Sequence, residues 1–187
     1  MATAIAERIV GNLIAASIVE EDDKALYIYG FFLLITHFFF FLIAVAFGFS
    51  MKIPLEGVIF YFVFVLLRSY AGGAHAKTET ACTMWTTLAI GASIAAVKVI
   101  ENSVRIVFPL LFLSNFCIFL FSPLESKEKP LDNNDRRNFR KICCGQLLAC
   151  NIVIFASLKL SCPALYGPVI CGMSLEAVLL CIGKMCN

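Results

Sequence analysis

Six long apolar stretches constrain the fold of this chain more than any other feature of its sequence. A helix needs about 20 predominantly apolar residues to cross the hydrocarbon core of a bilayer. The second stretch is short for a full crossing unless residues 54–57 or 68–71 extend it. We therefore predict an all-α, polytopic transmembrane protein that forms a single domain over residues 1–187. The expected spans are residues 25–49, 58–67, 81–100, 104–122, 142–160 and 164–183.

Composition and net charge agree with a membrane protein. Of the 187 residues, 60% are hydrophobic, whereas a soluble domain is about 45–50% apolar. The formal net charge of +2 is too small to indicate nucleic-acid binding, and the basic residues do not form a continuous stripe. No nucleic-acid partner is expected.

The distribution of the basic residues predicts the orientation of the spans. Six spans put both termini on one side of the membrane, and basic residues concentrate in cytoplasmic loops. With both termini inside, 11 of the 15 Lys and Arg residues face the cytoplasm and 4 face outside. The loops at residues 68–82 and 123–141 are then cytoplasmic as well. The 11 residues are Arg8, Lys24, Arg68, Lys77, Lys127, Lys129, Arg136, Arg137, Arg140, Lys141 and Lys184.

Residues 1–22 precede the first span and have the pattern of an amphipathic helix. Ile5, Ile9 and Leu13 recur at helical spacing, while Glu7 and Arg8 fall on another side. A signal peptide is disfavoured because these two charged residues interrupt the apolar run. We expect the segment to lie on the inner leaflet as an interfacial helix.

Nine cysteines are present, and most lie within the apolar stretches, where free cysteine behaves as a small buried hydrophobe. The sequence contains no C-x-x-C pair, and Cys143 is directly followed by Cys144. A zinc or redox cluster is therefore not indicated. We expect no metal site and no cofactor.

The segment RSYAGGAHAKTETAC, residues 68–82, places polar residues between two spans. A cysteine attacks a carbonyl carbon as its thiolate, and a nearby histidine can take the thiol proton and return it to a leaving amine. His75 and Cys82 are the residue types that such a dyad needs. On an unbroken helix they would lie about 10.5 Å apart along the axis, so the chain must bend between them.

Two glycines and two threonines provide the elements of that bend. Gly72 and Gly73 can adopt positive φ angles and allow close backbone approach. We expect Thr78 or Thr80 to cap the following helix, with Cys82 in its first turn. There the helix dipole and free N–H groups favour a thiolate and can stabilise an oxyanion. The alternative is that the histidine and the cysteine are ordinary interfacial residues, which their spacing alone favours because an isolated His–Cys pair is a weak motif.

The motif R-x3-GG-x-H-A-x5-C, preceded by the apolar run FVFVLL, resembles the accessory gene regulator B (AgrB) family of peptide-processing membrane peptidases. The later segment SPLESKEKPLD resembles the Pro- and Lys-containing loop of that family, and the chain length and number of spans agree. The resemblance implies that Cys82 is the nucleophile and His75 the general base and acid of a cysteine endopeptidase. It also implies a bacterial cell membrane as the location, and it makes a homodimer plausible.

The resemblance further implies an AgrD-type propeptide as substrate, with an amphipathic N-terminal helix, a central signal segment and an acidic C-terminal tail. The enzyme would remove the tail and hold the remainder as an acyl-enzyme thioester. It would then promote cyclisation of the remainder to a thiolactone or lactone quorum-sensing peptide.

Other charged residues near the membrane surface leave alternatives open. Arg68 either snorkels at the membrane boundary or has a function, by pairing with the propeptide tail or by holding the loop. We expect Gly72 and Gly73 to shape the loop rather than to contact substrate. The basic residues of the second loop either contact anionic lipid headgroups or bind the acidic tail. These residues are Arg136, Arg137, Arg140 and Lys141.

Two ionisable residues within the spans support a rival class of function. His37 and Glu176 lie inside apolar stretches, where ionisable groups are functional candidates. For His37 we favour a packed, neutral imidazole, whereas Glu176 either pairs with Gln146 or Asn151 or lies near a peptide cavity. The rival is a small peptide or ion transporter that uses both residues. A noncatalytic membrane scaffold is the third interpretation.

Overall fold

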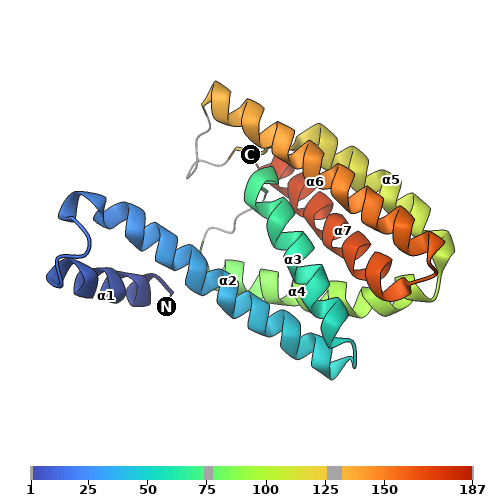
Figure 1. The fold of residues 1–187 in the computed structure, drawn as a ribbon, viewed down its shortest axis with the longest axis horizontal. Coiled ribbons are helices and arrows are strands. Elements are labelled where there is room, and N and C mark those ends of the chain that lie inside the picture. The colour runs from blue at the N-terminus through green and yellow to red at the C-terminus, as the bar shows by residue number, and fades with distance from the viewer. Residues whose placement is uncertain (1, 74–77, 126–131, 187) are drawn as a thin grey trace. The chain divides into compact units, whose positions relative to one another are not determined.

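The computed structural model of the protein describes residues 2–73, 78–125 and 132–186. Within these ranges the backbone forms seven α-helices, one short 3-10 helix and no β-strand (Figure 1). The predicted all-α class is therefore confirmed. The elements are α1 (Ala2–Ala15), η1 (Glu21–Asp23), α2 (Lys24–Ser50), α3 (Pro54–Ala71), α4 (Glu79–Glu101), α5 (Val104–Phe121), α6 (Asn133–Lys159) and α7 (Pro163–Cys186).

Helices α2 to α7 are long and apolar enough to cross a membrane, as the hydropathy of the sequence predicts. The short second stretch becomes an 18-residue helix because α3 begins at Pro54 and continues to Ala71, so both expected extensions occur. Proline suits the first position of a helix because it lacks the N–H group that would have no partner there. The chain is a multi-pass membrane protein.

Helix α6 begins earlier than its apolar stretch predicts. It starts at Asn133 rather than at residue 142, because hydropathy marks the part of a helix suited to the bilayer and not the whole helix. The additional residues contain no Pro or Gly, which would disfavour helix, and Asp135 in the first turn complements the helix dipole. Arg136 and Arg140 are therefore helical residues on one face, rather than parts of an irregular loop.

The chain forms two compact units, Met1–Ile43 and Ala44–Asn187. The first unit contains α1, η1 and the first part of α2. In α1, Ala6 and Val10 are buried, whereas Glu7 and Arg8 are exposed. The predicted amphipathic N-terminal helix is thus present, and its position on the inner leaflet stays a prediction.

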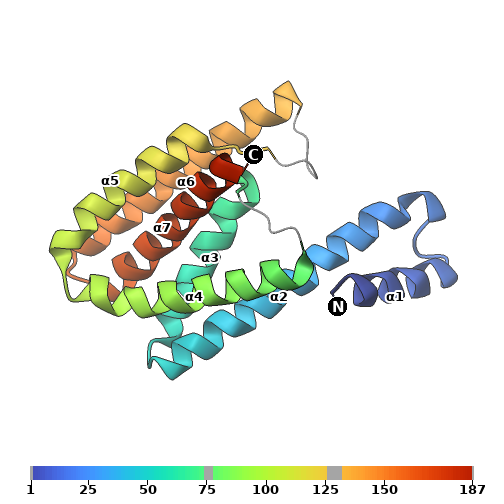
Figure 2. The ribbon, with the colours of Figure 1, turned by 180° about the vertical axis from the view of Figure 1, so that it is seen from behind.

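Helix α7 forms the centre of the second unit. It packs against α3, α4, α5 and α6, and Figures 1 and 2 show α5, α6 and α7 side by side. Small residues allow the close approach of α7 to α3, since a Cβ atom added to Gly172 would lie 3.0 Å from Val63 Cγ1 and 3.2 Å from the Phe60 carbonyl oxygen. On the surface of α5, by contrast, Phe112 is 75% exposed, as expected for a side chain that faces lipid.

Polar side chains within the apolar helices contact one another. Asn115 of α5 and Asn151 of α6 exchange two hydrogen bonds, of 3.1 and 2.8 Å. The hydroxyls of Ser114 and Ser174 lie 3.1 Å apart between α5 and α7. Such contacts stabilise the association of membrane helices, because a polar side chain that is surrounded by lipid has no water with which to form a hydrogen bond.

Candidate active site

The turn after α3 is built around Gly72 and Gly73. Their φ angles are +80° and +138°, a region that residues with a side chain rarely adopt. Space is equally restricted, since a Cβ atom at Gly72 would lie 2.3 Å from the Leu124 carbonyl oxygen and one at Gly73 would lie 1.6 Å from Arg68 Nη1. The positive φ angles and the close approach expected from the sequence are both present, so this turn requires glycine at both positions.

The glycine turn contacts the loop that follows α5. The Leu124 N–H donates a hydrogen bond of 2.8 Å to the Ala71 carbonyl oxygen, and Gly72 and Leu124 form an isolated parallel bridge. The two segments that carry the resemblance, residues 68–82 and 122–132, therefore meet in space. The sequence contains both motifs but no signal that they touch.

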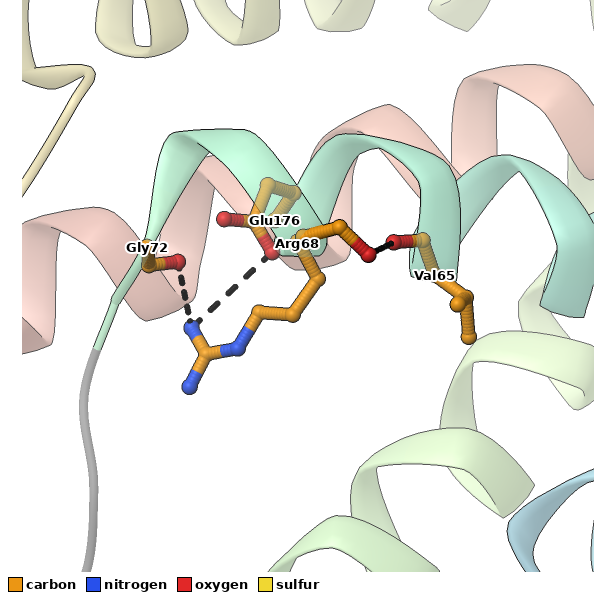
Figure 3. Close-up of polar contacts among 5 residues, drawn as sticks. Val65, Arg68, Gly72 and Glu176 are labelled. Atoms are coloured by element: carbon orange, nitrogen blue, oxygen red, sulfur yellow. Dashed lines mark hydrogen bonds and ion pairs between the residues drawn. The ribbon is translucent and has the colours of Figure 1, made fainter. Parts of the chain in front are cut away.

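Arg68 lies near the C-terminal end of α3 and forms a hydrogen bond with the backbone of the glycine turn (Figure 3). Its Nη1 atom donates a hydrogen bond of 2.8 Å to the Gly72 carbonyl oxygen. The same nitrogen lies 4.0 Å from Oε2 of Glu176 on α7, and the Arg68 side chain is 17% exposed. The guanidinium thus faces inward to the loop backbone instead of extending freely into the membrane surface.

Glu176 is fully buried, and among the described residues neither of its carboxylate oxygens has a hydrogen-bond partner. Of the alternatives that the sequence left open, pairing with Gln146 or Asn151 is contradicted. Gln146 Nε2 instead donates to the Leu66 carbonyl oxygen at 2.8 Å, and Asn151 is occupied by Asn115. Among the described residues, the charged group that lies within 4.0 Å of the Glu176 carboxyl group is the guanidinium of Arg68.

Cys82 lies at the start of α4, as the sequence predicts. Thr78, rather than Thr80, is the N-cap, and its Oγ1 accepts a hydrogen bond of 3.3 Å from the Ala81 N–H. Cys82 is the fourth helical residue and is partly exposed. Its own N–H donates to the Thr78 carbonyl oxygen at 3.0 Å, so the Cys82 amide is not one of the free N–H groups of the first turn. The positive end of the helix dipole remains next to the thiol.

His75 lies outside the described residues, as does Lys77. The structure nevertheless fixes both ends of their segment, because α3 ends at Ala71 and α4 begins at Glu79. The histidine and the cysteine therefore do not share one continuous helix, which would have kept them about 10.5 Å apart along its axis. Their mutual distance stays a prediction.

A groove of about 620 Å³ adjoins the glycine turn. It is lined by residues 120–125, which are the end of α5 and the start of the following loop, and by three basic side chains, Arg136, Arg140 and Lys184. Arg136 Nε donates to Glu125 Oε1 at 3.0 Å, and Arg140 lies over the Phe119 ring at 5.4 Å from its centroid.

Two of the four basic residues proposed from the sequence thus line the groove. The other two, Arg137 and Lys141, are exposed and are not among its lining residues. Lys184, which sequence reasoning did not select, comes from the last turn of α7. Basic residues at a helix C-terminus are common for reasons of the dipole alone, so the sequence offered no signal for this one.

Comparisons with known proteins identify relatives over most of the chain. The family model described as AgrB, accessory gene regulator B, matches residues 3–181. An AgrB-like protein 2 of Clostridium perfringens strain 13 is 27% identical over 158 residues, which cover 78% of this chain and 73% of that protein. An AgrB-like protein of Clostridium perfringens strain SM101 is 27% identical over 146 residues, covering 73% of this chain and 66% of that protein. No solved structure matches the chain.

Proposed function

The chain belongs to the accessory gene regulator B family, and on that premise we propose that it is a membrane-embedded cysteine endopeptidase that cuts and cyclises a short propeptide. Family membership links the protein to the processing of the agr quorum-sensing peptide and to an AgrD-type partner. The proposal adds the chemistry, with Cys82 as the nucleophile and His75 as the general base and acid.

The position of Cys82 carries the proposal. Its thiol is partly exposed in the first turn of a helix that Thr78 caps, and a helix N-terminus favours a thiolate over a thiol. Among the other cysteines, Cys117, Cys143 and Cys171 are buried within apolar helices, where a thiolate is disfavoured. A peptide could reach Cys82 from the aqueous side of the membrane surface.

The reaction proceeds by two acyl transfers. The Cys82 thiolate attacks the carbonyl carbon that precedes the acidic tail, and His75 gives its proton to the departing amine, which leaves the rest of the propeptide as a thioester on Cys82. A cysteine or serine within the propeptide then attacks the thioester. The Cys82–acyl bond breaks, a thiolactone or lactone ring forms, and Cys82 regains its proton.

Two physical factors favour ring closure over hydrolysis. Tethering of the internal nucleophile beside the thioester raises its effective concentration, and a site at the membrane edge limits the access of water. Thioester formation from an amide is uphill, so removal of the released tail helps to drive the cycle. Product formation in a purified reaction should therefore fall when free tail peptide is added.

We assign the basic groove to the acidic tail. Arg136, Arg140 and Lys184 face the groove, and Arg137 and Lys141 extend the positive charge along the same end of α6. Positive charge attracts an acidic peptide to this side of the membrane, and the excess of basic residues there indicates the cytoplasmic side. Both termini and both loops are accordingly proposed to be cytoplasmic in the cell membrane.

Coexpression with an AgrD-type propeptide, followed by mass spectrometry, tests the proposal. Wild-type protein should release the tail and form the cyclic product, whereas His75→Ala and Cys82→Ala should abolish both. Cys144→Ala provides a control, because Cys144 is also partly exposed but lies on α6. Tail release that survives in Cys82→Ala would exclude this mechanism, whereas the transporter and the scaffold predict no tail release by the wild-type protein.

A further inference from the structure

Glu176 is a buried ionisable residue that the proposed chemistry does not use. The residue is 0% exposed in the central helix α7. A carboxylate within apolar helices is costly unless a cation compensates it. Arg68 is the cation that the structure places there, with Nη1 at 4.0 Å from Oε2. This separation indicates an electrostatic attraction rather than a hydrogen bond.

The same Arg68 nitrogen also binds the turn. Nη1 donates to the Gly72 carbonyl oxygen at 2.8 Å, so one atom faces a negative group of α7 and a carbonyl of the loop (Figure 3). An arginine at the end of a membrane helix can otherwise extend its long side chain to the aqueous surface. Attraction to the buried Glu176 carboxyl group, 4.0 Å away, opposes that motion.

The Arg68 guanidinium packs directly against Gly73 in the turn. A Cβ atom at Gly73 would lie 1.6 Å from Arg68 Nη1, so the guanidinium occupies the space that any other residue would fill. On its opposite side the turn is fixed by the hydrogen bond from Leu124 to Ala71. Displacement of Arg68 would release one of these two attachments.

We propose that Glu176 is a positioning residue, whose charge holds Arg68 against the Gly72 carbonyl and thereby fixes the turn that precedes His75. The inference rests on the proposed function insofar as the positioned group is catalytic. It assigns Glu176 no contact with substrate. The turn geometry itself does not depend on the reaction, and it therefore provides a readout independent of cleavage.

Amide hydrogen exchange of the full-length protein in nanodiscs measures the turn directly. In Glu176→Gln the amides of Gly72 and Leu124 should exchange about tenfold faster, and kcat for the propeptide should fall by about tenfold with little change in KM, as expected for the loss of one charged interaction. Glu176→Asp keeps the charge and should retain much of both. Ser174→Ala is the matched control, because it removes a contact of α7 with α5 and leaves Arg68 untouched.

The double variant Arg68→Met, Glu176→Leu separates positioning from stability. Replacement of a buried ion pair by apolar residues is often neutral or stabilising, so its melting temperature should equal or exceed that of the wild type. Exchange at Gly72 and Leu124 should nevertheless stay fast, and kcat should stay low. If Glu176→Gln does not fold, this variant still shows whether the turn depends on the Arg68–Glu176 pair.

Two results would overturn the inference. One is unchanged exchange and kcat in Glu176→Gln, and the other is recovery of wild-type protection and kcat in the double variant. If the wild-type protein itself cleaved no propeptide, the proposed function would fail, while the exchange data would still decide whether Glu176 holds the turn.

Discussion

The two ends of the helical unit are built in different ways. At one end the connections are short, at residues 51–53, 102–103 and 160–162, and their hydrogen bonds are local, as from Ile53 N–H to the Gly48 carbonyl oxygen and from Cys162 N–H to that of Ser157. One side-chain contact there joins residues far apart in the sequence, because the Tyr166 hydroxyl donates to the Glu101 carbonyl oxygen at 3.4 Å. We call this the closed end, and it joins α2 to α3, α4 to α5 and α6 to α7.

At the other end the connections are longer, at residues 72–78 and 122–132. Besides local hydrogen bonds, this end has contacts between residues far apart in the sequence, namely Arg68 with Glu176 and Ala71 with Leu124. We call this the open end, and it carries the glycine turn, Cys82 and the basic groove. Short connections suffice to join antiparallel helices, whereas longer loops on a rigid scaffold are where function is usually found. The comparison indicates that the closed end supports the fold and the open end the chemistry.

The largest difference is expected between two cysteines. Cys82 and Cys162 are both partly exposed, and they lie at the open and the closed end respectively. Cys82→Ser should lower the rate of tail release by about four orders of magnitude or more, as loss of a nucleophile does in other hydrolases. Cys162→Ser should leave the rate within about twofold, since a substitution at the surface and away from the proposed site has little effect. Single-turnover kinetics with labelled propeptide measures both, and equal losses would contradict the division of roles.

The glycines provide the next largest contrast. Gly72→Ala imposes a Cβ atom at a φ of +80° and 2.3 Å from a carbonyl oxygen, and the left-handed conformation alone costs about 1–2 kcal/mol. We expect the variant to lose at least that much stability and most of its activity. Gly145 lies in α6, and in the described part of the chain no neighbouring atom lies within 4 Å of its added Cβ, so Gly145→Ala should be neutral or stabilising by up to about 1 kcal/mol. Thermal unfolding in detergent, followed with a cleavage assay, compares the two variants, and a harmless Gly72→Ala would show that the turn tolerates other shapes.

The same contrast explains what could be predicted from the sequence. The spans, the extension of α3 and the threonine cap of α4 follow from hydropathy, proline and capping preferences, all of which act within a few residues. The glycine pair likewise indicates its own backbone conformation.

The missing predictions concern contacts at the open end. No local sequence pattern predicts that Leu124 contacts Ala71, or that Lys184 lines the same groove as Arg136 and Arg140. Such contacts depend on which helix faces pack together. The apolar surroundings of Glu176 mark it as a functional candidate, but neither alternative that the sequence left open for it includes its contact with Arg68. The extra turns of α6 were missed because they are polar, so hydropathy ends before the helix does.

Charge reversal on α6 sharpens the comparison along one helix. Arg140 lies at the groove, and Lys159 lies in the last turn of the same helix, at the closed end. Arg140→Glu should raise KM for an acidic-tailed propeptide by about tenfold, because a close charge contact at a protein surface is worth roughly 1 kcal/mol or somewhat more. Lys159→Glu should leave KM unchanged.

Steady-state kinetics at two salt concentrations provides the check for this pair of variants. The wild-type KM should rise with ionic strength because salt screens exposed charges, and the Arg140→Glu variant should show less of this dependence. An equal effect of Lys159→Glu would mean that overall charge, rather than the groove, governs the affinity for the tail.

The smallest effect on activity is expected from substitution of the Asn115–Asn151 pair. The pair tests whether every contact between residues far apart in the sequence matters for function, or only those at the open end. The two amides join α5 to α6 through reciprocal hydrogen bonds, yet neither contacts the glycine turn or lines the basic groove. Asn151→Leu should lower stability by about 0.6 kcal/mol, the average for such contacts between membrane helices, and leave kcat and KM unchanged. Unfolding in denaturing detergent gives the first quantity, and the propeptide assay gives the second. A large loss of activity would mean that the open end depends on the packing of α5 against α6 as a whole, whereas a loss of stability alone would restrict the functional contacts to those that hold the turn.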